Sequence, residues 1–372
     1  MTGARADVAI VGGGLIGCAL AGELARRGRR VVVLEKREPG AEASGAAAGM
    51  LTPQSDALSR DAFFDLALES RDLYPAWSRE LADETGLDVG YRRTGLLHCR
   101  LEPPRPGSAD PYAWQRAAGL AVRARPPEDL AARLAQRLSP EVRDSIFFPD
   151  EGAVDPRALT RAVWRSAETR GATVRVGVAV TGFRIEGGAC RGVDTDDGFV
   201  EADATVDAAG AWAALGGALP LPLPVSPVRG QIVELWQERP VETIVSSEEV
   251  YLVPRADGTI LLGSTVEHVG FRKDVTAEAL ERLIGAAIRL LPELRRARFV
   301  SAWAGLRPGT PDGRPVLGAS PIRRLFFATG HYRNGILLAP VTARLLSALI
   351  CGETSRDLAA FSIERFSPAL AV

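Results

Sequence analysis

Residues 7–38, DVAIVGGGLIGCALAGELARRGRRVVVLEKRE, follow the pattern of a strand, a tight turn, a helix and a second strand. The apolar run at 8–11 is typical of a buried strand, as is the run RVVVLE at 30–35. Between the two runs, Leu15, Ala19 and Leu24 recur at helical spacing, and Gly28 stands where the helix would stop. The stretch therefore predicts a βαβ unit and a fold of the α/β class.

Three glycines at the turn, Gly12, Gly14 and Gly17, form the pattern G-x-G-x-x-G. Gly12 would permit the tight turn, Gly14 would let the backbone approach a pyrophosphate, and Gly17 would let helix and strand pack closely. The helix begins at Leu15 and Ile16, where free N–H groups and the helix dipole favour phosphate. The turn therefore predicts a phosphate-binding site.

Glu35 closes the second strand, with Lys36 directly after it. A carboxylate in this place accepts hydrogen bonds from ribose hydroxyls and disfavours a 2′-phosphate. The glycine pattern alone is weak, but here it follows a strand, opens a helix and has the acid at the right distance. We therefore predict a dinucleotide site of the Rossmann type; the alternative is a glycine turn in another βαβ unit.

The composition excludes several classes of protein. The 372 residues suggest two domains, and a net charge of −1 offers no positive field for nucleic acid. The four cysteines are far apart and the three histidines are scattered, so we expect neither a disulfide framework nor a metal site. Because unpaired thiols suit a reducing compartment, we expect a cytoplasmic protein. The longest apolar stretch is interrupted by Pro340 and Arg344, so we expect no membrane span.

Three further segments favour FAD over a nicotinamide cofactor. Residues 44–50, SGAAAGM, are small enough to lie against a large flat ring, although a flexible linker is the alternative reading. Residues 204–213, ATVDAAGAWA, end a strand at another small turn, and 325–340, LFFATGHYRNGILLAP, lead from a strand into a helix whose N-terminus would face the flavin. The cofactor contacts expected from these segments are Ser44, Ala47, Ala48, Gly49, Ala209, Gly210, His331, Arg333, Asn334, Gly335, Ile336 and Leu337.

These motifs, with PVRGQ, YLVPR and WAGLRPGTPDGRPVLG, resemble the D-amino-acid oxidase superfamily and, within it, the glycine oxidases. The resemblance runs from residue 8 to residue 340. It implies a discontinuous Rossmann-type FAD-binding domain and an α+β substrate domain with a large antiparallel sheet. The implied ranges are 1–88, 150–222 and 300–372 for the first and 89–149 and 223–299 for the second.

The resemblance also implies roles for single residues. Arg307 matches the arginine that binds the substrate carboxylate, and Tyr251 matches a tyrosine that hydrogen-bonds the same group. Arg333 matches an arginine near substrate and flavin, and Met50 matches a residue of the pocket wall. The chain departs from the family at Val266, where a methionine is expected, so the preference for glycine itself stays open.

Other implications concern the cofactor and the assembly. Val180 matches a backbone contact to adenine. Relatives that bind flavin covalently do so through a cysteine near the segment matching 306–315, and this chain has none there, so non-covalent FAD is implied. The family further implies a homotetramer and a link to thiamine synthesis.

Arg307 stands among glycines and prolines, so we expect it in a loop. A solvated surface position is the ordinary alternative, but an amino-acid oxidase needs a permanent cation whose planar fork binds a carboxylate.

The predicted reaction oxidises glycine or a small amine with molecular oxygen to an α-keto acid, ammonia and hydrogen peroxide. A dehydrogenase with another electron acceptor and a subunit of a heteromeric oxidase remain alternatives, no general base is assigned, and His98 is expected to be structural.

Overall fold

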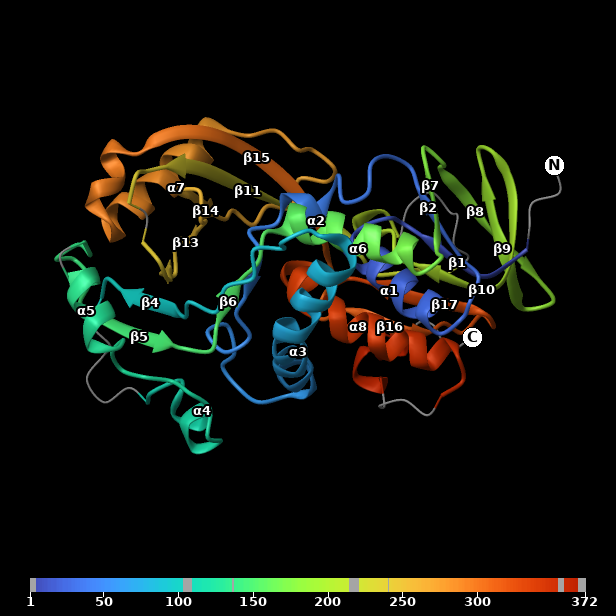
Figure 1. Ribbon diagram of the computed structural model, residues 1–372, viewed down its shortest axis with the longest axis horizontal. Coiled ribbons are helices and arrows are strands. Elements are labelled where there is room, and N and C mark those ends of the chain that lie inside the picture. Colours follow the sequence, from blue (N-terminus) through green and yellow to red (C-terminus); the bar gives the residue numbers. More distant parts are fainter. Residues whose placement is uncertain are drawn as a thin grey trace.

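The computed structural model describes residues 5–102, 109–135, 137–213, 221–239, 241–353 and 358–366. Within them, an 8-stranded sheet and a 7-stranded sheet stand side by side, and the chain passes between them several times (Figure 1). A small ribbon of β3 (Met50–Leu51) and β6 (Gly152–Ala153) lies between the two sheets. The predicted α/β architecture with two parts is therefore confirmed.

The first sheet contains the predicted βαβ unit, in which β1 pairs in parallel with β2. Its other neighbour, β10, is also parallel, and β17 continues the parallel set. The carboxyl ends of these strands therefore meet at one edge, where α/β sheets bind ligands. The strands in spatial order are β16 (Val316–Ala319), β17 (Leu325–Thr329), β10 (Gly198–Asp207), β1 (Ala6–Val11), β2 (Val31–Glu35) and β7 (Thr173–Val176), with β8 (Val180–Glu186) and β9 (Ala189–Thr195) attached through β10.

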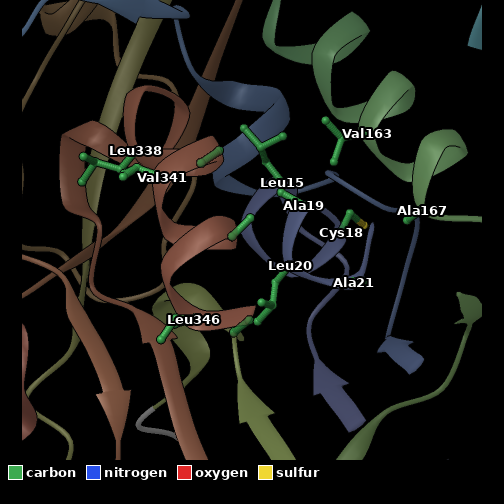
Figure 2. Close-up of a cluster of buried hydrophobic side chains, with 14 of the residues drawn as sticks. Leu15, Cys18, Ala19, Leu20, Ala21, Val163, Ala167, Leu338, Val341 and Leu346 are labelled. Carbon is green, nitrogen blue, oxygen red and sulfur yellow. The ribbon is translucent and has the colours of Figure 1, made fainter. Parts of the chain in front are cut away.

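Helices cover one face of this sheet. Figure 2 shows Leu15 and Leu20 of the first helix, Val163 of a second and Leu338 of a third, which belong to one cluster of buried side chains. A Cβ placed on Gly22 would be 3.6 Å from Ala167, so the first two helices approach closely without a clash. The helices of this layer are α1 (Leu15–Arg26), α3 (Ala62–Thr85), α6 (Pro156–Thr169) and α8 (Gly335–Ile350).

The segment Tyr332–Ile350, which includes α8, is the one candidate for a membrane span among the described residues. Its mean hydropathy is 1.2, but 61% of the segment is buried inside the protein. Leu338, Val341 and Leu346 of α8 belong to the core beneath the sheet (Figure 2). The helix is therefore as apolar as a core position requires.

The second sheet is mainly antiparallel, and its two faces have different environments. Residues such as Val233, Leu252 and Leu262 pack against the helix α7 (Ala277–Leu290), whereas Ile232 and Val253 belong to a separate cluster that includes Ala48 and Ala153. The strands in spatial order are β15 (Arg298–Gly309), β11 (Ser226–Trp236), β14 (Thr259–Gly263), β13 (Tyr251–Pro254), β12 (Ile244–Ser246), β4 (Leu96–Arg100) and β5 (Asp144–Phe148). The remaining helices are α2 (Ala43–Ala46), α4 (Ala113–Ala117) and α5 (Glu128–Ala135).

Strand β15 corrects two expectations. The domain boundary expected at residue 300 falls inside this strand, which pairs with β11 along its whole length, so we propose a boundary after Gly309. Arg307 lies in β15 and not in a loop. The glycines and prolines around Arg307 suggested a loop, but an edge strand such as β15 tolerates them. Pro308 is paired with Pro227 on β11, at a position where neither residue donates a backbone hydrogen bond to the other strand.

Candidate active site

A cavity of about 570 Å³ opens between the carboxyl edge of the first sheet and the inner face of the second. It brings together most of the residues that the sequence singled out, from all parts of the chain. The predicted residues that line it are Gly12, Gly14, Leu15, Ile16, Glu35, Lys36, Ser44, Ala47, Ala48, Gly49, Met50, Val180, Ala209, Gly210, Tyr251, Arg307, His331, Arg333, Asn334, Gly335 and Ile336.

Three of the predicted residues lie elsewhere. Gly17 is a packing position, since a Cβ there would come within 3.0 Å of the carbonyl oxygen of Gly12. Leu337 was expected at the cofactor but is buried in the main core beneath the sheet. Val266, where the chain departs from the family, is 50% exposed and does not line the cavity, so the structure gives it no part in the size of the pocket.

The glycine turn has the geometry that its pattern predicts. Gly12 has a φ of +104°, and a Cβ there would be 2.6 Å from the carbonyl oxygen of Ala208, the residue directly after the neighbouring β10. Gly14 precedes α1 without a side-chain cap, and the next amide, that of Leu15, donates to Oγ of Ser44 at 3.0 Å. The backbone can therefore come close to a ligand at the positive end of this helix.

The carboxylate of Glu35 is held at the end of β2 by backbone groups. Its Oε2 accepts from the amide of Gly13 at 2.7 Å, and its Oε1 accepts from the amide of Arg37 at 2.8 Å. Each oxygen keeps a second lone pair for a further donor. Because Glu35 also lines the cavity, these lone pairs suit the hydroxyls of a ribose.

The small-residue segment is fixed by its neighbours, so the reading as a flexible linker is wrong. Indole Nε1 of Trp303 donates to the carbonyl of Ala46 at 3.0 Å, and Nη2 of Arg255 donates to that of Ala48 at 2.7 Å. Gly49 has a φ of +82°, and a Cβ there would come within 3.0 Å of Val154. The segment presents small, rigidly held residues to the cavity, as a flat ring requires.

A second helix end faces the cavity at Asn334 and Gly335, where α8 begins without a side-chain cap and without an acidic residue in its first turn. The two positive helix ends, the acid on β2 and the small-residue wall form a site that fits a dinucleotide with an extended aromatic ring. The residues present therefore fit FAD.

Arg307 projects from β15 into the cavity near Tyr251. Its Nη1 donates to the carbonyl of Thr265 at 3.0 Å and its Nη2 to Oγ of Ser264 at 2.6 Å. No carboxylate forms an ion pair with Arg307 in the part of the chain that the structure describes. Burial lowers the pKa of its guanidinium, and the neighbouring Arg333 lowers it further, but an arginine stays charged at neutral pH. The cavity therefore contains a cation with neutral partners only.

The ring of Tyr251 lies over a glycine on the adjacent strand. A Cβ on Gly263 would come within 3.0 Å of the phenol oxygen and ring carbons of Tyr251. Tyr251 therefore leans toward β14, on the side from which Arg307 approaches. Met50 and Arg333 also line the cavity, from β3 and from the turn before α8.

Two buried ionisable groups are also part of the cavity wall. Nε2 of His331 lies 3.1 Å from Oγ1 of Thr342, and burial lowers the pKa of His331 to about 3, so its ring is neutral. Asp207, at the carboxyl end of β10, accepts from the amide of Ala209 at 3.0 Å, and burial raises its pKa to about 7. The other carboxylate oxygen, Oδ2, has no partner in the described residues.

The sequence did not reveal several residues of the cavity. His98 was expected to be structural, but it lines the cavity together with Ser246, Ser264 and Gly230. The strand pattern around residue 98 gave no sign of this, because only the pairing of β4 with β12 brings His98 beside Ser246. Gly230 could have been recognised only once its position beside Arg307 was known.

The fold and the cavity define a flavin-dependent oxidoreductase. Residues 7–349 match the family of FAD-dependent oxidoreductases, and the chain belongs to this family, as the resemblance predicted. The chain is 38% identical over 368 residues to the glycine oxidase of Geobacillus kaustophilus, with 97% of each protein covered. The crystal structure of the glycine oxidase from this organism matches with a TM-score of 0.91 and covers 98% of this chain and 99% of its own.

A second group of relatives is longer. The bifunctional protein ThiO/ThiG of Trichormus variabilis is 38% identical over 374 residues, which are 97% of this chain and 55% of that protein. The chain thus spans about half the length of these bifunctional relatives. The crystal structure of L-proline dehydrogenase from P. horikoshii is also similar, with a TM-score of 0.84, 25% identity and 97% of this chain covered.

Proposed function

We propose that the chain oxidises glycine or a small amine, such as sarcosine or a small D-amino acid, with FAD as the bound cofactor. The observation that carries this proposal is the cation of Arg307, which has only neutral partners and lies in the same cavity as the dinucleotide cradle. A buried cation favours an anionic ligand. The relatives named glycine oxidase support a carboxylate of amino-acid size.

In this proposal, the chain's own residues act by binding and orientation. Thr265 and Ser264 hold the guanidinium of Arg307 in one plane, so that its fork can receive both oxygens of the substrate carboxylate. Tyr251 adds a neutral donor beside it. When bound, FAD would supply the two-electron redox chemistry, with molecular oxygen as the final acceptor and hydrogen peroxide as the product. The oxidised substrate is an imine, which water hydrolyses to the α-keto acid and ammonia, or methylamine where the substrate is sarcosine.

We further propose that FAD binds without a covalent bond, because none of the four cysteines lines the cavity. The names of the bifunctional relatives support a role in the synthesis of the thiamine thiazole. We also propose the cytoplasmic location inferred from the unpaired cysteines and the homotetramer implied by the family resemblance. A dehydrogenase that uses another electron acceptor, or a flavin subunit of a heteromeric oxidase, is not favoured by the oxidases among the curated relatives.

The test uses purified holoenzyme with glycine, sarcosine and D-alanine as substrates. We expect hydrogen peroxide to form in proportion to the oxygen consumed, and ammonia from glycine and D-alanine, or methylamine from sarcosine, to appear in equal amount. Reduction of the flavin with negligible oxygen uptake would instead identify a dehydrogenase. Bound flavin that none of these amines reduces would refute the proposed reaction.

A further inference from the structure

One row of paired residues crosses the inner face of the second sheet. Ile232 on β11 faces Gly263 on β14, which faces Tyr251 on β13; Tyr251 faces Ser246 on β12, which faces His98 on β4. Directly paired residues place their side chains on the same face of a sheet. Because Ile232, Tyr251, Ser246 and His98 all line the cavity, this row forms part of its wall.

Tyr251 divides the row into two parts. Its ring lies over Gly263, on the side of β15 and Arg307, so it leaves the neighbouring position on β12 uncovered. Ser246 and His98 occupy this second part, one and two strands beyond Tyr251. With about 4.8 Å between strands, the backbone of His98 is about 10 Å from that of Tyr251. Glycine held at Arg307 is too short to reach this part of the cavity.

The imidazole of His98 is oriented by its neighbour. Nδ1 of His98 lies 3.1 Å from Oγ of Ser246, which is 8% exposed, whereas Nε2 of His98 has no hydrogen-bond partner among the described residues. Burial lowers the pKa of His98, and Arg100 lowers it further, so the ring is neutral at pH 7. A neutral imidazole with one nitrogen held can exchange a hydrogen bond with a ligand through the other.

The surroundings of this pair indicate the charge of the ligand. Asp56 lines the cavity as an exposed carboxylate, and its charge, like that of Glu248, acts on His98. The charge of Arg100 also acts on His98, but Arg100 is paired with Asp144 at 3.3 Å, so the carboxylates are in excess around His98. A second carboxylate on the substrate would be repelled here. A hydroxyl or an amide has no such cost and matches the donor and acceptor capacity of imidazole and serine.

We propose that His98 and Ser246 form a second polar subsite, which binds a hydroxyl or amide group on the substrate end remote from the carboxylate. The substrates it favours are N-substituted glycines or amino acids whose chain ends in such a group. This inference rests on the proposed function, because Arg307 must hold the carboxylate for the other end to reach His98. It assigns the preference among amines to the row on the second sheet, and not to Val266.

The test compares two substrates of nearly equal size, N-hydroxyethylglycine and N-propylglycine. We expect the holoenzyme to prefer the hydroxyl compound in kcat/KM by about tenfold, and His98→Leu to remove most of this preference. Ser246→Ala removes the partner that orients the imidazole of His98 but keeps Nε2 of His98, and it should reduce the preference by about threefold. His268→Leu is the matched control, since His268 is exposed and outside the cavity, and should keep the full preference.

Two outcomes would overturn the subsite: no preference in the holoenzyme, or an equal preference in His98→Leu and the wild type. Oxidation of glycine in the same preparations separates these outcomes from a failure of the proposed function. If no amine is oxidised, binding is compared by calorimetry with two thioether carboxylic acids, (2-hydroxyethylthio)acetic acid and (propylthio)acetic acid. Equal affinity of the wild-type holoenzyme for these two acids would then reject the subsite.

Discussion

Gly230 on β11 lies directly against the guanidinium of Arg307 on β15. A Cβ at position 230 would come within 3.0 Å of Cζ and of both terminal nitrogens of Arg307. The register explains this contact, because Arg307 faces Val228, and Gly230 is the diagonal neighbour two residues further along β11. The arginine can therefore lie flat across the sheet, with Thr265 and Ser264 as its hydrogen-bond partners, only if residue 230 has no side chain.

Replacing Gly230 should consequently displace Arg307 without touching the cofactor cradle. We expect Gly230→Ala to raise KM for glycine by more than about tenfold, because a clash of this kind moves the guanidinium out of its plane. The flavin content of the purified protein should not change. Gly285→Ala is the control, since a Cβ there meets nothing within 4 Å. An unchanged KM in Gly230→Ala would show that the position of the guanidinium does not govern binding.

Arg307 itself should be sensitive to shape as well as to charge. Arg307→Lys keeps a cation but loses the planar fork, and Arg307→Ala leaves the substrate carboxylate without a partner, at a cost of about 2–5 kcal/mol in binding. We expect KM to rise in the order wild type, Lys, Ala, with FAD retained in all three. Steady-state kinetics and flavin absorbance measure both quantities. A KM that stays constant across the series would show that Arg307 does not bind the substrate.

Glu35 should affect the cofactor and not the substrate. Glu35→Ala removes the acceptor for the amides of Gly13 and Arg37 as well as the proposed ribose contact. We expect the dissociation constant for FAD to rise by at least about tenfold, measured by fluorescence on reconstitution of the apoprotein. Glu38→Ala, at an exposed position outside the cavity, is the matched control. Full flavin content in Glu35→Ala would contradict a role in ribose binding.

The parts of the site that the sequence predicted are local in the chain. The glycine turn, the helix start and Glu35 lie within one βαβ unit, so their spacing alone indicates their arrangement. Arg307 was recognised as a binding residue by resemblance, but its strand was not, because glycine and proline normally indicate a turn. The contact of Gly230 with Arg307 and the pairing of His98 with Ser246 depend on strand register between distant segments. Local sequence patterns contain no information about that register.

Asp207 should make stability depend on pH. It is 1% exposed, and burial raises its pKa from 3.8 to about 7. Because the pKa is raised in the folded state, the contribution of Asp207 to the free energy of unfolding is complete below about pH 4 and is lost as the pH rises to about 7. The loss amounts to about 4 kcal/mol. Urea unfolding across this range should therefore show a smaller fall in the free energy of unfolding for Asp207→Asn than for the wild type; equal slopes would contradict the assignment.

Glu151 fixes the backbone of Gln54 and Ser55, in the segment that follows β3. Its Oε1 accepts from the amides of Gln54 at 2.7 Å and Ser55 at 2.8 Å, while Oε2 is buried without a partner in the described residues. Gln115 adds a bond from its Nε2 to the carbonyl of Gln54 at 2.8 Å, and the hydroxyl of Tyr112 donates to the carbonyl of Ser55 at 3.1 Å. Ser55 lines the cavity, so this buried cluster determines the position of the cavity wall.

Two substitutions of Glu151 separate its charge from its hydrogen bonds. Burial raises the pKa of Glu151 from 4.5 to about 8, so its contribution to stability is complete below about pH 4.5 and is lost as the pH rises through 8. Glu151→Gln keeps an acceptor for both amides and should reduce this pH dependence, with KM nearly unchanged. Glu151→Leu leaves the amides of Gln54 and Ser55 unpaired, at about 1–3 kcal/mol each, and should raise KM more than it lowers kcat. If Glu151→Leu retains the wild-type KM while its melting temperature falls, the cluster stabilises the fold but does not position the cavity wall.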